Sequence, residues 1–170
     1  MSDNINIERH PWKPFLPSNA RILLLGSFPP PRNRWSMDFY YPNFTNDFWK
    51  MMGLIFFDDP SHFIIKGKKA FDQPGIESFL NKKGIALFDA ATAIYRKKGN
   101  ASDLHLEIIE ATDIPALLKQ IPHCLTIAVT GEKSAQTVLG PYKIETPTIG
   151  YSVAVPQLRN GLHLYRMPST

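Results

Sequence analysis

Two residues in and beside an aromatic loop, Tyr41 and Asn46, have side chains that suit a binding or catalytic site. The loop spans residues 32–45 and contains the run Tyr-Tyr-Pro-Asn-Phe at positions 40–44. A loop of this length in a compact domain is usually functional or disordered, and its aromatic content argues against disorder. An asparagine amide cannot act as a general base at neutral pH, but it can orient a water molecule or hydrogen-bond the edge of a ring. Two structural roles compete with this interpretation, because Tyr41 could pack in the core and Asn46 could cap the helix that follows it.

Four short apolar runs are typical of strands buried on both faces, and the first of them leads into the aromatic loop. A continuous apolar run of this kind, bounded by small or polar residues, indicates a strand of a parallel sheet. The four predicted strands are Arg21–Ser27, Ile85–Asp89, Leu125–Thr130 and Leu162–Met167.

Helical patterns occupy the segments between these strands. In the first of them, the apolar residues Phe48, Trp49, Met52 and Ile55 have the spacing of one helical face. Prolines in the first turn, a Thr-Asp start signal and a terminal glycine mark the ends of the others. The four predicted helices are Asn46–Phe56, Pro74–Asn81, Thr112–Gln120 and Gly131–Leu139.

This alternation of strands and helices predicts an α/β fold in a single domain over residues 1–170. The expected architecture is a three-layer α/β/α sandwich with a central four-stranded parallel sheet. Ligands of such sheets bind beyond the carboxyl ends of the strands, so a site is expected after Ser27, Asp89, Thr130 and Met167. For Asp89 itself we favour a structural role, in which it caps the following turn, over a role in the site.

Two motifs near the N-terminus carry a resemblance to a known family. The stretches G-S-F-P-P at 26–30 and Y-Y-P-N-F-T-N-D-F-W at 40–49 are similar to the first motif and the following segment of the uracil-DNA glycosylase superfamily. The nearest branch contains the hypoxanthine-DNA glycosylases and, more distantly, the mismatch-specific uracil-DNA glycosylases. Further similar stretches lie at 85–90, 100–103, 130–131 and 167–170, so the resemblance covers most of the chain. It implies a uracil-DNA glycosylase-like fold.

The resemblance also implies a base pocket lined by Ser27, Phe28 and Tyr41, with Asn46 as the catalytic residue. Tyr41 matches the aromatic residue on which the flipped base stacks, and Phe28 would line the opposite wall, with core packing as the alternative for each. Asn46 matches the asparagine that resembles the catalytic one in hypoxanthine-DNA glycosylases. Ser27 stands where other branches carry a catalytic Asn, Asp or Glu, which favours the branch whose key asparagine lies downstream.

Four residues are expected to contact the DNA backbone: Arg32, Arg34, Ser169 and Thr170. The two arginines lie in the aromatic loop, whereas the basic clusters at 66–69, 82–83 and 96–98 are expected to be solvated faces. The terminal Met-Pro-Ser-Thr resembles the start of a second motif that grips phosphates, with a plain exit from the last strand as the alternative. In relatives this motif continues into a final helix, so we expect the chain that ends at Thr170 to lack that helix.

Composition narrows the function classes further. A net charge of +4 and a pI near 9.2 mildly favour a polyanionic partner. The single cysteine, Cys124, excludes an internal disulfide and is expected to be a buried, inert thiol. The five histidines form no ligand pair at helical spacing and the glycines form no dinucleotide fingerprint, so neither a metal nor any other cofactor is expected. The run Ile22–Leu25 is far shorter than the roughly 20 residues that span a bilayer, which predicts a soluble, cytoplasmic protein.

The predicted function is therefore that of a monofunctional DNA glycosylase. It would excise a deaminated base, hypoxanthine or uracil, by base flipping and hydrolysis of the N-glycosidic bond in base-excision repair. DNA with such a base is the expected partner, and a monomer is the expected state. Two alternatives remain: a non-catalytic nucleic-acid-binding domain of the same fold, and a hydrolase or transferase for free nucleosides or nucleotides.

Overall fold

A mixed sheet of five strands, in the order β3-β2-β6-β8-β7, forms the centre of the computed structural model. The structure describes residues 6–97 and 105–170, so the stretch 100–103 that carries part of the resemblance lies outside the described residues. Four neighbouring strands are parallel, and β7 pairs antiparallel at one edge. The strands are β2 (Ile22–Gly26), β3 (Ile85–Asp89), β6 (Thr126–Thr130), β7 (Ser152–Ala154) and β8 (His163–Met167). The four predicted strands are thus confirmed as the parallel part of the sheet, and β7 is an addition to the prediction.

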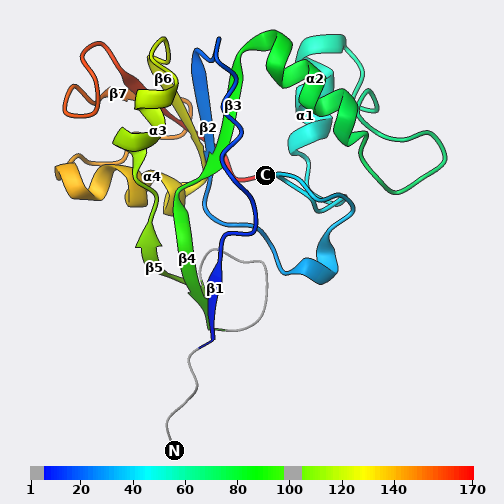
Figure 1. Cartoon of the computed structure of the whole chain (residues 1–170), viewed down its shortest axis with the longest axis horizontal. Helices are drawn as coiled ribbons and strands as arrows, with labels where there is room; N and C mark the ends of the chain where they lie inside the picture. The colour runs from blue at the N-terminus through cyan, green and yellow to red at the C-terminus, as the bar shows by residue number, and fades with distance from the viewer. Residues whose placement is uncertain (1–5, 98–104) are drawn as a thin grey trace, which may run out of the picture.

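Helices lie on both sides of this sheet, as predicted. Figure 1 shows α1 and α2 beside β3, and α3 and α4 on the other side of the central strands. The helices are α1 (Phe48–Phe57), α2 (Gln73–Lys83), α3 (Ile114–Gln120) and α4 (Glu132–Leu139). Short 3-10 turns, η1 (Arg32–Arg34) and η3 (Gly140–Tyr142), lie in the connections. All four predicted helices are therefore confirmed, with ends that shift by one or two residues.

One detail of the first helix differs from its predicted pattern. Phe48, Trp49 and Met52 are buried as expected, whereas Ile55 is 71% exposed. The last turn of α1 still packs on the core through Phe56, which contacts Phe79, and Phe57, which contacts Phe63. Ile55 therefore lies on the side of this turn that faces solvent, and apolar spacing alone did not separate the two sides.

A second, three-stranded antiparallel sheet lies below the carboxyl ends of the central strands and was not predicted. Its order is β1-β4-β5, and it consists of β1 (Ile7–Arg9), β4 (Ala91–Arg96) and β5 (Leu106–Ala111). β3 runs almost directly into β4 through Ala90, as the green ribbon in Figure 1 shows. Ala91, Ile94 and Leu106 form a small separate core, against which Phe28 packs.

Arg96 corrects the expectation that the basic clusters are solvated faces. Its side chain is only 3% exposed, and its guanidinium donates to Glu8 Oε1 at 2.9 Å and to the main-chain oxygen of Pro29 at 2.9 Å. A buried charge of this kind needs such partners to offset its lost hydration. Arg96 therefore ties the small sheet to the loop that follows β2.

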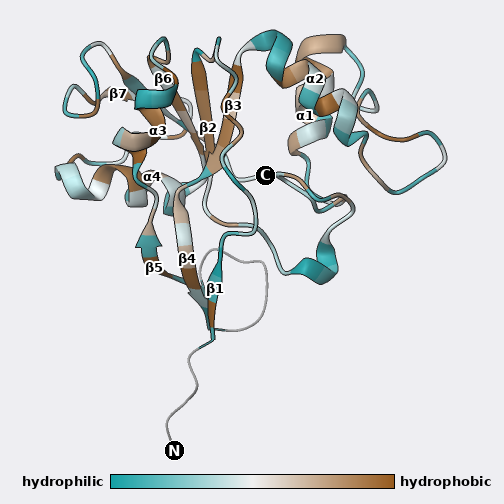
Figure 2. Ribbon diagram, viewed as in Figure 1, coloured by the Kyte–Doolittle hydropathy of each residue, from teal (hydrophilic) through white to brown (hydrophobic). Residues whose placement is uncertain are grey.

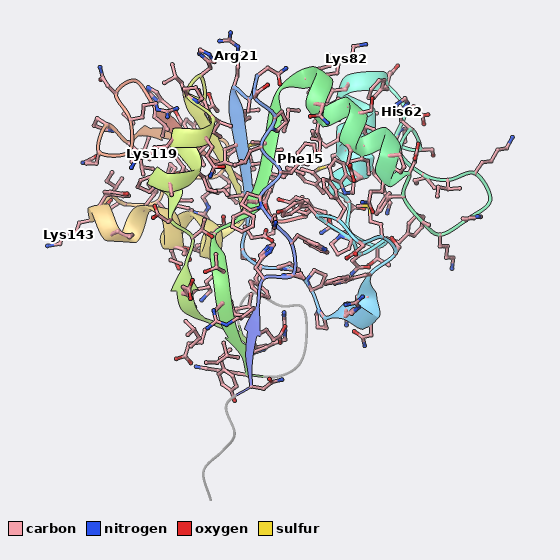
Figure 3. The ribbon with its side chains drawn as sticks, in the orientation of Figure 1. Phe15, Arg21, His62, Lys82, Lys119 and Lys143 are labelled. Atoms are coloured by element: carbon pink, nitrogen blue, oxygen red, sulfur yellow. The ribbon has the colours of Figure 1, made fainter. Side chains whose placement is uncertain are left out.

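The hydrophobic core lies around β2 and β3, which are the brown strands at the centre of Figure 2. Phe15, labelled near the middle of Figure 3, makes an antiparallel bridge to Leu87 and so places the N-terminal segment beside β3, the edge strand of the sheet. Cys124 is fully buried, and burial raises the pKa of its thiol, as expected for an inert cysteine. Arg21 and Lys82 point outward at the amino edge of the sheet, opposite the strand ends where ligands bind (Figure 3). In the described part of the chain, no helix has the length and apolar character needed to cross a membrane.

Candidate functional site

A pocket of about 270 Å³ opens at the carboxyl ends of the central strands, where the fold predicts it. Six residues expected in the site share its lining: Ser27, Phe28, Tyr41, Asn46, Ser169 and Thr170. Residues that the sequence did not assign to it complete the wall: Trp12, Gly26, Pro29, Pro30, Pro42, Asn43, Thr45, Asp89 and Thr130. The predicted arginines, Arg32 and Arg34, lie outside the lining, exposed in η1.

A buried contact between a histidine and a carboxylate beside the pocket is the main feature that sequence reasoning missed. Nε2 of His10 lies 2.8 Å from Oδ2 of Asp89, and the two side chains are only 3% and 9% exposed. Asp89 ends β3 and lines the pocket. The side chain of Asp89 thus contacts His10, and only its main-chain oxygen accepts from Thr112 in the turn that we favoured from the sequence.

His10 reaches Asp89 from the N-terminal segment, 79 positions away along the chain. Its ring lies among the aromatic rings of Trp12, Phe28, Tyr40 and Phe88. Its Nδ1 lies 3.0 Å from the main-chain oxygen of Trp12 and 3.2 Å from that residue's amide nitrogen. An ionised carboxylate can only accept hydrogen bonds. When Asp89 is ionised, the proton of this hydrogen bond therefore belongs to Nε2 of His10. A single histidine without a nearby motif gave no signal that could have predicted this contact.

The same carboxylate influences a nearby tyrosine. Burial raises the pKa of the Tyr40 hydroxyl, and the negative charge of Asp89 raises it further. Tyr40 therefore stays protonated, and it donates to the main-chain oxygen of Lys13 at 2.7 Å. This contact helps to hold the N-terminal segment, and with it His10, against the sheet.

Gly26 makes room for the second carboxylate oxygen of Asp89. Asp89 stands next to Gly26 in the register of β2 and β3, and a Cβ atom on Gly26 would overlap Oδ1 of Asp89. The same atom would lie 3.4 Å from the Tyr41 hydroxyl. The described residues provide no hydrogen bond to this oxygen, so it is available to a ligand or a water in the pocket.

We predict that Gly26→Ala displaces the Asp89 carboxylate and lowers activity by tenfold or more, with little loss of stability. The backbone of Gly26 does not have a positive φ, so the added methyl acts by its contacts rather than by backbone strain. Base release and thermal unfolding measure the two effects. Gly75→Ala is a matched control, because its Cβ would overlap the carboxylate of Asp72, which caps the start of α2 away from the pocket. Equal losses of activity in both variants would contradict the assigned role of Gly26.

Tyr41 is held in one orientation by contacts on its ring and its hydroxyl. It has a φ of 51°, which is uncommon for a residue other than glycine. Its ring stacks on Phe48 with centroids 3.7 Å apart, and its hydroxyl lies 3.0 Å from Oγ1 of Thr130 at the end of β6. The ring is thus a fixed part of the pocket wall, as a stacking surface for a base requires.

Asn46 links the aromatic loop to the last residue of the chain. Its Oδ1 accepts from the amide of Phe48 at 2.8 Å, which is the helix-start contact that the sequence allowed for. Its Nδ2 donates to the main-chain oxygen of Thr170 at 2.8 Å and to Oγ1 of Thr170 at 3.1 Å. The structural role is therefore present, and Asn46 also lines the pocket.

The composition of the lining restricts the chemistry of the site. Phe28 is half-buried, with its ring 5.5 Å from that of His10, and Ser27 is 8% exposed. Within the described residues, the lining contains no lysine. The same residues contain no group of three His, Cys, Asp or Glu side chains with the spacing of a metal site. The polar groups of the pocket are thus one carboxylate, one histidine behind it, two asparagines and several hydroxyls.

Neither a family model nor a curated protein matches this chain. Among solved structures, it is similar to the solution NMR structure of a protein from Methanosarcina acetivorans named "putative Uracil DNA glycosylase". The TM-score is 0.59 and the sequence identity is 24%, over 96% of this chain and 84% of that chain. The likeness thus extends over nearly the whole chain. The chain therefore has a uracil-DNA glycosylase-like α/β fold, which confirms the fold implied by its motifs.

Proposed function

We propose that this protein is a monofunctional DNA glycosylase that removes a deaminated base, hypoxanthine or uracil, from DNA. One observation carries the proposal: a pocket of about 270 Å³ at the strand ends combines aromatic walls with a buried carboxylate and an asparagine amide. This volume lies near the lower limit of ~300–1,000 Å³ for small-molecule sites, as suits a single base. The fold shared with the protein named "putative Uracil DNA glycosylase" supports the same function.

In the proposed reaction, the target nucleotide leaves the base stack and its base enters the pocket against Tyr41. The bond between the base nitrogen and C1′ of the sugar breaks, and its electron pair leaves with the base. A water oxygen bonds to C1′ and its proton passes to the Asp89 carboxylate. The negative charge of Asp89 also favours the positive charge that develops on the sugar.

Asn46 has two parts in this proposal. Its Oδ1 caps α1 through the amide of Phe48 and has a second lone pair that can accept from the attacking water or from a base N–H. Its contact with Thr170 places the terminal segment at the mouth of the pocket, where Ser169 and Thr170 would meet the DNA backbone. A lining without lysine supports hydrolysis rather than a Schiff-base mechanism with strand cleavage. We further propose that one domain, acting as a monomer, suffices for the reaction.

Release of the base from oligonucleotides tests this function. Labelled single-stranded and duplex DNA with one uracil, hypoxanthine or xanthine is incubated with the protein, and abasic sites are then cleaved with alkali. Cleavage that depends on the damaged base would establish the glycosylase and identify its substrate. Binding without release would instead support the non-catalytic domain, and release from free deoxyuridine or deoxyinosine alone would support a nucleoside hydrolase.

A further inference from the structure

Two tryptophans from separate segments lie together at the rim of the pocket. Trp12 of the N-terminal segment lines the pocket, and the ring of Trp35 lies 4.7 Å from it with a tilt of 42°. Both side chains are partly exposed, whereas the third tryptophan of the chain, Trp49, is 1% exposed in the core. Large aromatic residues that stay partly exposed beside a pocket commonly bind a partner.

Hydrogen bonds hold both indoles in place. Nε1 of Trp12 donates to Oδ1 of Asp38 at 2.8 Å, and Nε1 of Trp35 donates to the main-chain oxygen of Pro30 at 2.8 Å. Trp12 also packs edge-on against Tyr40, with centroids 5.3 Å apart. The rings are therefore preorganised, which lowers the entropy that binding would cost.

Arg32 lies next to the two tryptophans. The guanidinium carbon of Arg32 lies 5.3 Å above the ring of Trp35. Arg32 and Arg34 are exposed in η1, and η1 has no acidic residue in its first turn. Figure 2 draws this turn in teal, in contrast to the apolar strands above it. The surface that leads away from the pocket is thus aromatic at Trp12 and Trp35 and positively charged at Arg32.

We propose that Trp12, Trp35 and Arg32 form a stacking wall for an unpaired nucleotide adjacent to the base in the pocket. Aromatic rings beside cations are the usual means by which proteins bind single-stranded nucleic acid, because every base has a face that can stack and every nucleotide has a phosphate. Trp12 belongs to both the pocket and the wall, so a strand with its base in the pocket continues onto Trp35.

The wall gives the protein a preference for single-stranded DNA. In a duplex, the bases next to the target keep both faces stacked on their neighbours, so their faces cannot contact Trp35 without further unstacking. In a single strand these faces are free. This inference rests on the proposed function only in that the pocket receives a base.

Binding of unmodified oligonucleotides to the full chain tests the wall without any need for base release. We expect single-stranded (dT)8 to quench the tryptophan fluorescence and to bind at least tenfold more tightly than a duplex of the same length. Trp35→Leu should weaken (dT)8 binding by about tenfold and leave duplex binding nearly unchanged. Trp35→Phe, which keeps a ring for stacking, should restore most of the affinity, and Tyr151→Leu, an exposed aromatic residue outside the pocket lining, should match the wild type.

A second variant keeps the test decisive if Trp35→Leu fails to fold. Arg32 is exposed, so Arg32→Ala should fold normally, and it should lower the slope of log affinity against log salt by about one. Equal affinity for single strands and duplexes, absence of quenching, or a folded Trp35→Leu variant with wild-type affinity would overturn the wall. Tighter binding of (rU)8 than of (dT)8 would also overturn it, because the partner would then be RNA.

Failure of the wall and failure of the proposed function give different results. If (dT)8 binds and quenches the fluorescence but no base is released, the stacking wall is supported and the glycosylase function is contradicted. If the Trp35→Leu variant releases base from single strands with unchanged KM and kcat, the glycosylase function is supported and the stacking wall is contradicted.

Discussion

Asp89→Asn is expected to lower the rate of base release by a hundredfold or more while the fold remains intact. Among the described residues that line the pocket, Asp89 has the one charged side chain, and it is 9% exposed, so its field acts on the developing positive charge of the sugar with little screening. Removal of a single preorganised stabilising group of this kind typically costs about 10²–10³ in kcat. Asparagine has the same shape and can still accept from Nε2 of His10. Single-turnover rates on a damaged oligonucleotide, with thermal unfolding alongside, measure the two effects.

Asp113→Asn is the matched control for this substitution. Asp113 also carries a carboxylate that accepts a hydrogen bond, from the amide of Ala116 at 2.9 Å, but it caps α3 outside the pocket. Asparagine is about as good a cap as aspartate, so this variant should keep both stability and activity. If Asp89→Asn released bases at the wild-type rate, the carboxylate would have no part in the reaction and its contact with His10 would be purely structural.

Asn46→Ala is expected to abolish most turnover and to leave the fold in place. The substitution removes the acceptor for the Phe48 amide, which should lower the free energy of unfolding by about 1 kcal/mol, as for other lost caps. It also removes both contacts to Thr170 and the group that would orient the attacking water. Single-turnover rates and chemical denaturation of the same samples separate the loss of activity from the loss of stability.

Asn46→Asp distinguishes the two ends of the amide. Aspartate retains the acceptor for the Phe48 amide and stands favourably at a helix start, so stability should be close to that of the wild type. It has no N–H group, and therefore it loses the donor to Thr170 and places a second negative charge in the pocket. Activity kept in Asn46→Asp but lost in Asn46→Ala would assign the role to the acceptor oxygen, and activity lost in both would show that the N–H donor is needed. Near-normal rates in Asn46→Ala would remove Asn46 from the mechanism.

The parallel sheet and its helices could be predicted from the sequence because their signals are local. For example, the apolar run Ile22–Leu25 forms most of the buried strand β2. Asp113 caps α3 by accepting from the amide of Ala116, three residues further along the chain. The ends of parallel strands meet at one edge by geometry alone, so the approximate place of the pocket followed as well. Motif positions then indicated Tyr41, Phe28 and Asn46, all of which line it.

The tertiary structure alone brought His10 and the two tryptophans to the pocket region. His10 and Asp89 lie 79 positions apart, and Trp12 and Trp35 come together from two irregular segments. The antiparallel strand β1 has three residues, too few to show a periodic pattern. Contacts of this kind depend on packing between segments distant in the chain, for which composition and spacing carry no signal. The sequence by itself thus determined the four parallel strands, the four helices and the edge at which a ligand is expected, whereas long-range packing decided the buried contact between His10 and Asp89 and the pairing of the two tryptophans.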